Sequence, residues 1–204
     1  MAQKENSKAE QGEKQDIKKY QYLFEMDGIL LYPFYVASPD DLYQKKIYEE
    51  AFSNDFIVQH IRGMITQDEC DVSIISTYLT EEIKEWKKIK IKELIPECKD
   101  IYLLPYEKES KTKYLKEDKK QILIDTSFRV LTEWRDKSGL ALQAINANVN
   151  QEIWNGPTIN LFGGFTAERI CNLALLDRKK LQEIQKQAIS ELEQKRIETE
   201  IWKA

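Results

Sequence analysis

Two acidic residues, Glu25 and Asp27, stand between the apolar segments QYLF and ILLYPF. Carboxylates this close in sequence can hold a divalent cation or serve as general acid and base. Asp-Gly between apolar segments is also the strongest short-range signal for a β-hairpin. The pair is therefore either a turn or part of a functional site. The secondary structure around it distinguishes these two possibilities.

Other polar residues follow or precede apolar segments in a similar way. Ser76 follows DVSII, Asp125 ends QILID, and Lys111 lies shortly before the latter segment. Mg²⁺ prefers carboxylate oxygens, whereas lysine and hydroxyl groups hold phosphate oxygens. If these positions converge, they predict a site for a phosphate with Mg²⁺.

The elements that would bring them together are short apolar strands separated by helical patterns. Strands are expected at residues 21–25, 71–75, 101–104, 121–125 and 140–145. Such unalternating apolar strands are typical of a parallel sheet buried on both faces. Ligands bind beyond the carboxyl ends of strands in open α/β sheets, so Glu25, Asp27, Ser76, Lys111 and Asp125 are expected at one sheet edge.

The helices between these strands are predicted from capping residues. One is expected from Ser38-Pro39-Asp40-Asp41 to Phe52, and a second begins after Asn54 with Phe56, Ile57, Ile61 and Ile65 on one face. A third follows Thr80 to Glu93 with Ile83, Trp86 and Ile89 inward, and a fourth runs from Ser127 to Lys137. The basic segment 87–93 is explained equally well by a solvated helix face and by contacts to phosphate.

Three regions are predicted along the chain. Residues 1–17 are charged and read as a disordered tail, and residues 18–165 form the core domain with a loop at 156–165. Residues 166–204 form a C-terminal helix with an apolar stripe. The first half of this helix is expected to pack on the core, while the second half could pair with a partner helix.

The composition of the chain limits its possible partners and its location in the cell. The chain has 204 residues and a net charge of −4, which suits one domain and disfavours duplex nucleic acid as a partner. Cys70, Cys98 and Cys171 show neither a disulfide framework nor zinc spacing, which indicates a reducing compartment. No apolar run is long enough to span a membrane and no signal peptide is visible, so a cytoplasmic location is expected.

Four segments in order resemble the motifs of the haloacid dehalogenase superfamily, in particular its small 5′-nucleotidase-like members from phages and low-GC bacteria. They are FEMDGILL, DVSIISTYLTEEIKEW, LLPYEKESKTKYL and ILIDTSFRVLTEWRDKSGLALQAINANVNQEIW, and the resemblance covers residues 20–156. It implies an α/β Rossmannoid three-layer sandwich with a five-stranded parallel sheet. The cap is minimal, because residues 29–70 must supply helices that cover the sheet, and a helical extension follows at the C-terminus.

The resemblance also implies roles for the residues above. Glu25 falls on the position of the catalytic nucleophile and Asp27 on that of the general acid and base. Ser76 and Lys111 would bind phosphate, while Glu25, Asp27 and Asp125 would hold Mg²⁺. The substrate would be a small phosphorylated molecule such as a nucleotide.

The chain departs from the family pattern at the site itself. Glu25 replaces the nucleophilic aspartate, Thr126 replaces a second acid beside Asp125, Ile29 replaces a threonine, and Ser138 replaces one glycine of a pair. A glutamate oxygen would lie about 1 Å from the required position, and a misplacement of that size can cost about 10²-fold in rate. Two hypotheses stay open: a phosphohydrolase with weak or absent activity, or a non-catalytic binding or assembly subunit on this scaffold.

A third hypothesis comes from ILIDTS, which also resembles the first strand of PIN-type nucleases. Such domains need further strands and acidic residues downstream. The last part of this chain is expected to be helical, so this alternative is disfavoured.

Overall fold

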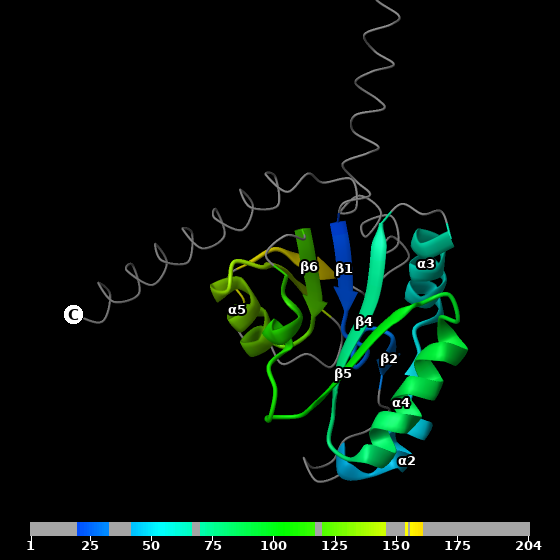
Figure 1. Cartoon of the computed structure of the whole chain (residues 1–204). Coiled ribbons are helices and arrows are strands. Elements are labelled where there is room, and N and C mark those ends of the chain that lie inside the picture. The colour runs from blue at the N-terminus through cyan, green and yellow to red at the C-terminus, as the bar shows by residue number, and fades with distance from the viewer. Residues whose placement is uncertain are drawn as a thin grey trace, which may run out of the picture.

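The central element is a six-stranded sheet in which every neighbouring pair is parallel, with the strand order β5-β4-β1-β6-β7-β8 (Figure 1). The computed structural model describes residues 20–32, 42–66, 70–116, 120–145, 154 and 156–160. The strands are β1 (Tyr20–Phe24), β4 (Asp71–Tyr78), β5 (Asp100–Pro105), β6 (Lys120–Asp125), β7 (Leu140–Ile145) and β8 (Thr158–Asn160).

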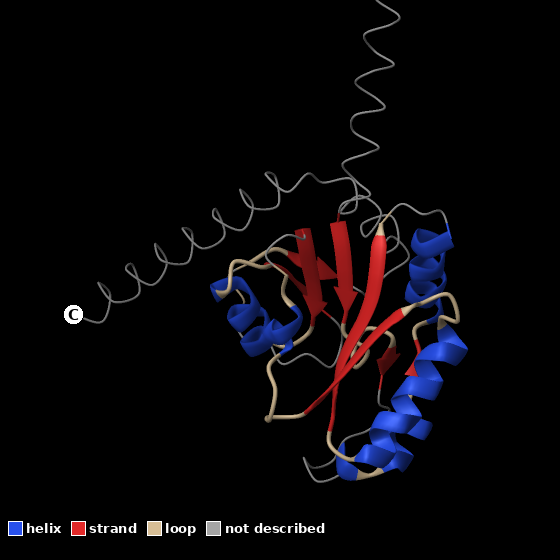
Figure 2. Ribbon diagram, in the orientation of Figure 1, coloured by secondary structure: helices blue, strands red, loops and turns tan. Residues whose placement is uncertain are grey.

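Helices cover both faces of this sheet (Figure 2). Successive residues of β1 point to opposite faces, as the strand geometry requires. Tyr22 and Phe24 belong to an apolar cluster with α3 (Asp55–Thr66) and α4 (Glu81–Leu94), whereas Leu23 belongs to a second cluster with α5 (Phe128–Asp136). The architecture is therefore a three-layer α/β/α sandwich of Rossmannoid type, as the sequence predicts in outline.

The segment between β1 and β4 holds small elements and one longer helix. β2 (Leu31–Tyr32) pairs antiparallel with β3 (Phe52–Ser53), and the short helix α2 (Lys45–Glu49) lies between them in sequence. Helix α3 follows and buries Ile57 and Ile61 against the sheet. Between β5 and β6 the chain forms a single 3-10 turn, η2 (Lys111–Tyr114).

Three predicted helix starts are confirmed by side-chain caps. The Asn54 carboxamide oxygen accepts the Ile57 amide at 3.3 Å, and the Thr80 hydroxyl accepts the Ile83 amide at 3.2 Å. The Ser127 hydroxyl accepts the Val130 amide at 3.5 Å. Each side chain satisfies a backbone donor that has no partner within its own helix.

The expected strand count is wrong, because the sheet has six strands rather than five. The additional strand, β8, lies within the segment 156–165 that the sequence analysis assigns to a loop, and it pairs parallel with β7. Three residues are too few to show a periodicity, and Gly156-Pro157 directly before them resembles a turn signal.

Two helix predictions also need correction. In the described part of the segment up to Phe52, only Lys45–Glu49 is α-helical, and Phe52 lies in β3. On α4, Ile89 is 59% exposed instead of inward, and on α3 Phe56 is exposed as well. The buried stripe of α4 follows a spacing of four through Ile83, Lys87 and Ile91, and Ile89 lies off that stripe.

Several predictions fall outside the described residues: the tail 1–17, the helix start at 38–41 and the C-terminal helix 166–204. Within the described ranges, no helix has the length and apolar character needed to cross a membrane.

Candidate active site

The chain leaves β1 through a tight turn that is not a β-hairpin. The Leu30 amide donates to the Met26 carbonyl at 2.9 Å, and the Gly28 amide donates to the Leu31 carbonyl at 2.7 Å. Gly28 has a φ of 77°, a conformation that glycine adopts without steric cost. Because β1 pairs parallel with β4 and β6, Glu25 and Asp27 lie at the carboxyl end of a central strand. Asp27-Gly28 is therefore a turn, and this turn lies at the candidate site.

The Glu25 carboxylate, which is almost fully buried, is held by four donors from its own chain. Its Oε1 atom accepts the backbone amides of Met26 at 2.9 Å and Asp27 at 3.1 Å, and also the Ser76 hydroxyl. Its Oε2 atom accepts the Lys111 ammonium group. Ser76 reaches this position from β4 and Lys111 from η2, so three separate segments meet at one carboxylate.

Lys111 also binds Asp125, which ends β6. The distance from Lys111 Nζ to Asp125 Oδ2 is 2.5 Å, and the other oxygen of Asp125 accepts the Ser127 amide at 2.8 Å. Glu25, Lys111 and Asp125 are 5%, 4% and 2% exposed. The ammonium group therefore bridges two carboxylates that are largely shielded from solvent, where charge pairing is stronger than at the surface.

Lys87, which its sequence context does not single out as a site residue, completes the cluster. Its ammonium group binds the Asp27 carboxylate, the Thr77 carbonyl at 2.7 Å and the Ser76 hydroxyl at 3.2 Å. Lys87 is fully buried, so assigning it to a solvated helix face is wrong. It comes from α4 on one face of the sheet, whereas η2, which carries Lys111, packs through Tyr114 against the cluster on the other face.

Tyr48 of α2 covers the buried lysine. The Lys87 ammonium group lies 5.0 Å from the centre of the Tyr48 ring, within the range of a cation–π contact. Burial raises the pKa of the Tyr48 hydroxyl, and the negative charge of Asp27 raises it further. Tyr48 is therefore neutral at physiological pH and adds no second negative charge beside Asp27.

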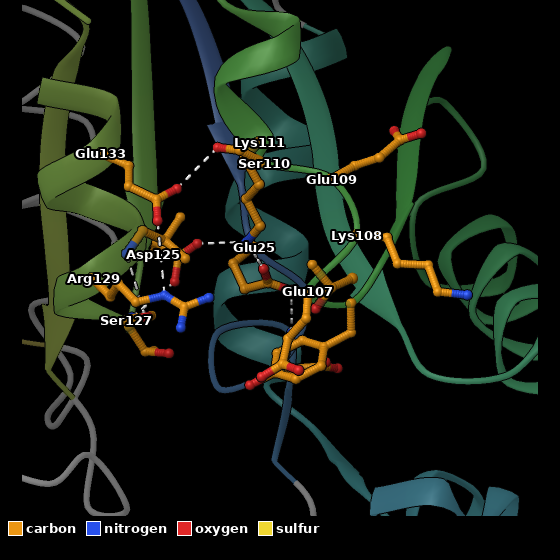
Figure 3. A pocket seen from close by; sticks show the side chains of 15 residues that line it. Glu25, Glu107, Lys108, Glu109, Ser110, Lys111, Asp125, Ser127, Arg129 and Glu133 are labelled. Carbon is orange, nitrogen blue, oxygen red and sulfur yellow. Dashed lines mark hydrogen bonds and ion pairs between the residues drawn. The ribbon is translucent and has the colours of Figure 1, made fainter. Parts of the chain in front are cut away.

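A cavity of about 310 Å³ opens at this edge of the sheet. Its lining includes Glu25 and Asp125 and also Lys108, Arg129 and Glu133, all labelled in Figure 3. The Ser110 hydroxyl donates to Glu133 at 2.9 Å, which links η2 to α5 across one side of the cavity. Thr126, at the position of the missing second acid, also lines this space.

The structure thus brings together all five residues predicted from sequence, and their chemical roles stay predictions. The charges of the cluster are nearly balanced, because three carboxylates (Glu25, Asp27 and Asp125) face two ammonium groups. Each carboxylate binds at least one lysine. This arrangement can stabilise the sheet edge without any bound ion.

The predicted magnesium site stays a prediction, and in this arrangement of side chains Glu25 and Asp125 share a lysine. The Lys111 ammonium group lies where a cation shared by Glu25 and Asp125 would lie. Among the described residues, no three acidic, histidine or cysteine side chains are grouped so as to hold a metal ion. Magnesium at Glu25 and Asp125 would therefore require Lys111 to move away.

Comparisons with known proteins add little to this geometry. No protein-family model matches the chain, and no curated protein matches it. Among solved structures, a chain of the "Structure of Pnkp1/Rnl/Hen1 complex" is similar, with a TM-score of 0.47 and 13% identity. That alignment covers 62% of this chain and 46% of the other.

Proposed function

We propose that the chain is a haloacid dehalogenase-like domain of the phosphohydrolase class whose hydrolysis of phosphomonoesters is weak or absent. The observation that carries this proposal is that Ser76 and Lys111 both bind the carboxylate of Glu25. These are the two side chains that the family resemblance assigns to phosphate. A nucleophile whose oxygens accept four internal donors is poorly placed to attack a phosphoryl group.

If activity persists, Asp27 is the best candidate for general acid and base. Its side chain is about one-third exposed, whereas Glu25 and Asp125 are enclosed. The substrate would be a small phosphorylated molecule such as a nucleotide, and it would enter through the 310 Å³ cavity. Magnesium, if it takes part, would have to displace Lys111 from Asp125, so we expect any activity to need a high Mg²⁺ concentration.

The test is a turnover assay with nucleoside monophosphates in the presence of Mg²⁺. We expect the native chain to fall far below the ordinary enzyme range of about 1–10³ per second. The double substitution Glu25→Asp with Thr126→Asp should raise turnover, because it withdraws the carboxylate from Ser76 and adds an acid beside Asp125. Adding Asp27→Asn to that double variant should abolish the gain while circular dichroism shows that the triple variant is folded, a check that is needed because Asp27→Asn also weakens the fold.

Two results would contradict this proposal. One is turnover by the native chain at ordinary rates, which would mean that Glu25 acts as an effective nucleophile without substitution. The other is turnover in the double variant that survives Asp27→Asn, which would place the reaction outside this site.

A second candidate is a non-catalytic binding or assembly subunit, favoured by the engagement of all three carboxylates with internal cations. The proposed partner surface is the second half of the C-terminal segment 166–204, which lies outside the described residues. Truncation after Gln187 followed by sedimentation analysis tests it. Loss of a dimer with an unchanged circular dichroism spectrum would support this candidate, and an unchanged mass would count against it.

A further inference from the structure

We propose that a second cavity, next to the one at the candidate site, binds a guanine ring. This cavity has a volume of about 700 Å³ and lies at the carboxyl ends of β4 and β5, where Tyr78 and Tyr106 form part of its wall. The inference deepens the proposed function, on which it rests for placing a phosphate group in the neighbouring cavity. It adds the chemical class of the ring that such a ligand carries.

The first argument is the aromatic character of the 700 Å³ cavity. Three tyrosines from separate segments line it: Tyr43 before α2, Tyr78 at the end of β4 and Tyr106 after β5. Tyr43 and Tyr106 are 55% and 46% exposed, so a ligand can reach their rings. Tyr78 differs, because the Lys84 ammonium group lies 5.0 Å from the centre of its ring. Accessible aromatic side chains stack on any flat base, so the two exposed rings favour a planar ligand without selecting one base.

The second argument concerns two charged side chains that can select the base, Glu107 and Lys108. Both line the 700 Å³ cavity, and within the described part of the chain neither side chain has a hydrogen-bond or ion-pair partner. Glu81 also lines the cavity, but its carboxylate pairs with the Lys84 ammonium group at 2.8 Å. One carboxylate and one ammonium group are therefore available to a ligand.

The edge of guanine matches this pair of charges. It presents the O6 acceptor, the N1–H donor and the 2-amino donor side by side. The Glu107 carboxylate only accepts hydrogen bonds and can bind both donors together, whereas the Lys108 ammonium group can donate to O6. Adenine has an acceptor at N1, which would face the carboxylate unfavourably. Hypoxanthine keeps O6 and N1–H but lacks the amino group, so it should bind with intermediate affinity.

The third argument is continuity with the candidate site. Tyr106, Glu107 and Lys108 line both the 700 Å³ cavity and the 310 Å³ cavity. In Figure 3 the Lys108 side chain extends away from Glu25 and Asp125. One ligand can therefore occupy both cavities, with its phosphate in the smaller one and its ring in the larger one.

The turn that carries the two charged residues is fixed by its own backbone. The amides of Lys108 and Glu109 both donate to the Pro105 carbonyl at 3.3 Å. Glu107 has a φ of 58°, a conformation that is uncommon for residues other than glycine and recurs at functional sites. The backbone of this turn is thus set before a ligand binds, which lowers the entropic cost of binding.

The experiment measures binding of nucleosides to the full chain by titration with saturation-transfer NMR, in Mg²⁺-free buffer. Nucleosides carry no phosphate, so the result depends neither on Glu25 nor on catalysis. Guanosine is expected to bind about tenfold more tightly than adenosine, with inosine between the two. N-acetyltyrosinamide, an aromatic ring without the edge of a base, should bind about tenfold more weakly than guanosine.

Two kinds of substitution separate base selection from stacking. Glu107→Gln should abolish the preference for guanosine over adenosine, because its amide replaces one acceptor with a donor that adenine N1 can accept. Tyr106→Ala should weaken binding of all three nucleosides about tenfold, whereas Tyr106→Phe keeps the ring and should bind them like the native chain. If circular dichroism shows that Tyr106→Ala is unfolded, Tyr43→Ala replaces it, with the same expectation.

The matched control is Glu109→Gln. Glu109 lies on the same turn and its substitution changes the net charge equally, but it pairs with Lys113 at 2.8 Å and does not line the 700 Å³ cavity. Glu109→Gln should therefore leave the preference for guanosine unchanged. Equal effects of Glu107→Gln and Glu109→Gln would indicate a general effect of charge and would overturn the inference.

Three other results would overturn it. They are the absence of saturable guanosine binding, equal affinity for guanosine and adenosine, and equal affinity for guanosine and N-acetyltyrosinamide. The last result would indicate a pocket for the aromatic side chains of a peptide instead of a base.

These outcomes are separate from those of the turnover assay. Turnover by the Glu25→Asp and Thr126→Asp double variant, with no guanosine bound by the native chain, would refute the inference alone. Guanosine bound selectively by the native chain, with no gain of turnover in the double variant, would support the inference and refute the expected restoration of catalysis.

Discussion

The ammonium group of Lys87 binds the carboxylate of Asp27, 60 positions earlier in the chain. The two partners differ in environment, because the Lys87 side chain is 1% exposed and that of Asp27 is 34% exposed. This asymmetry means that the two halves of the ion pair should not be equally important for stability.

We expect Asp27→Asn to destabilise the protein more than Lys87→Met does. Asp27→Asn leaves a buried ammonium group without its counter-charge, which costs about 3–5 kcal/mol when a buried pair is broken. Lys87→Met leaves a carboxylate that water can still reach, so a loss of about 1 kcal/mol or less is expected. Urea unfolding measures both, with Lys88→Met, an exposed neighbour on α4, as the control. Equal losses of stability in the two variants would contradict this expectation, because they would mean that hydration does not stabilise the unpaired Asp27 carboxylate.

A buried amide chain crosses three strands and should be similarly sensitive. Gln121 donates to Gln21 at 2.8 Å, and Gln21 donates to Ser73 at 2.8 Å. Gln121→Leu should lower the free energy of unfolding by about 1–3 kcal/mol. It leaves the side-chain carbonyl of Gln21 and the backbone amide of Lys116 without their hydrogen-bond partner. In urea unfolding, the double variant with Gln21→Leu should lose less than the sum of the single losses. Strict additivity would mean that the two amides act independently.

Substitution by alanine is expected to have opposite effects on stability at two glycines. A Cβ atom on Gly139 would lie 2.2 Å from Trp134 Nε1, whereas one on Gly63 of α3 would meet nothing within 4 Å. Gly139→Ala should therefore destabilise by about 1–3 kcal/mol through overpacking. Gly63→Ala should stabilise by up to about 1 kcal/mol, the usual gain within a helix. Thermal unfolding distinguishes the two, and equal melting temperatures would refute the packing described around Trp134.

The Cys98 thiol should react slowly in the folded protein. Burial raises the pKa of this thiol, although the nearby Ile74 backbone and Lys92 counteract part of the effect. A raised pKa means less thiolate at any given pH, and the thiolate is the reactive form. Iodoacetamide labelling with peptide mapping should therefore show Cys98 modified at higher pH in the native chain than in urea. Identical profiles in the two states would contradict this expectation.

The sequence predicted most of what positions the site. Leu140–Ile145 has the expected bounds, and Asn54, Thr80 and Ser127 cap helices as expected, because apolar runs and caps are local signals. The convergence of Glu25 with Lys111, 86 positions apart, was predicted from the parallel topology together with the family resemblance, since Lys111 precedes its strand and does not end one. The pairing of these two side chains could not be predicted, since it depends on how η2 packs.

Lys87 shows where local interpretation fails. The segment KKIKIKE is basic overall, which suggests exposure of all its lysines. Lys87 differs from the others, because the residues four positions before and after it, Ile83 and Ile91, are both buried. A lysine in the middle of an apolar stripe is the signal that could have found it. A lysine in such a position needs a buried counter-charge. The acid that supplies it, Asp27, had been assigned only to catalysis and metal binding.

The central position of β1 has a consequence for how the protein is made. β1 is synthesised first among the described strands, yet its neighbours are β4 and β6, with Gln21 beside Asp71 and Tyr20 beside Lys120. Contacts between such distant positions must close long loops, which slows folding. One edge of β1 therefore stays unpaired on the ribosome until residues up to Asp125 have emerged. Nascent chains that stop before β6 should be sensitive to protease and should depend on chaperones that shield open strand edges.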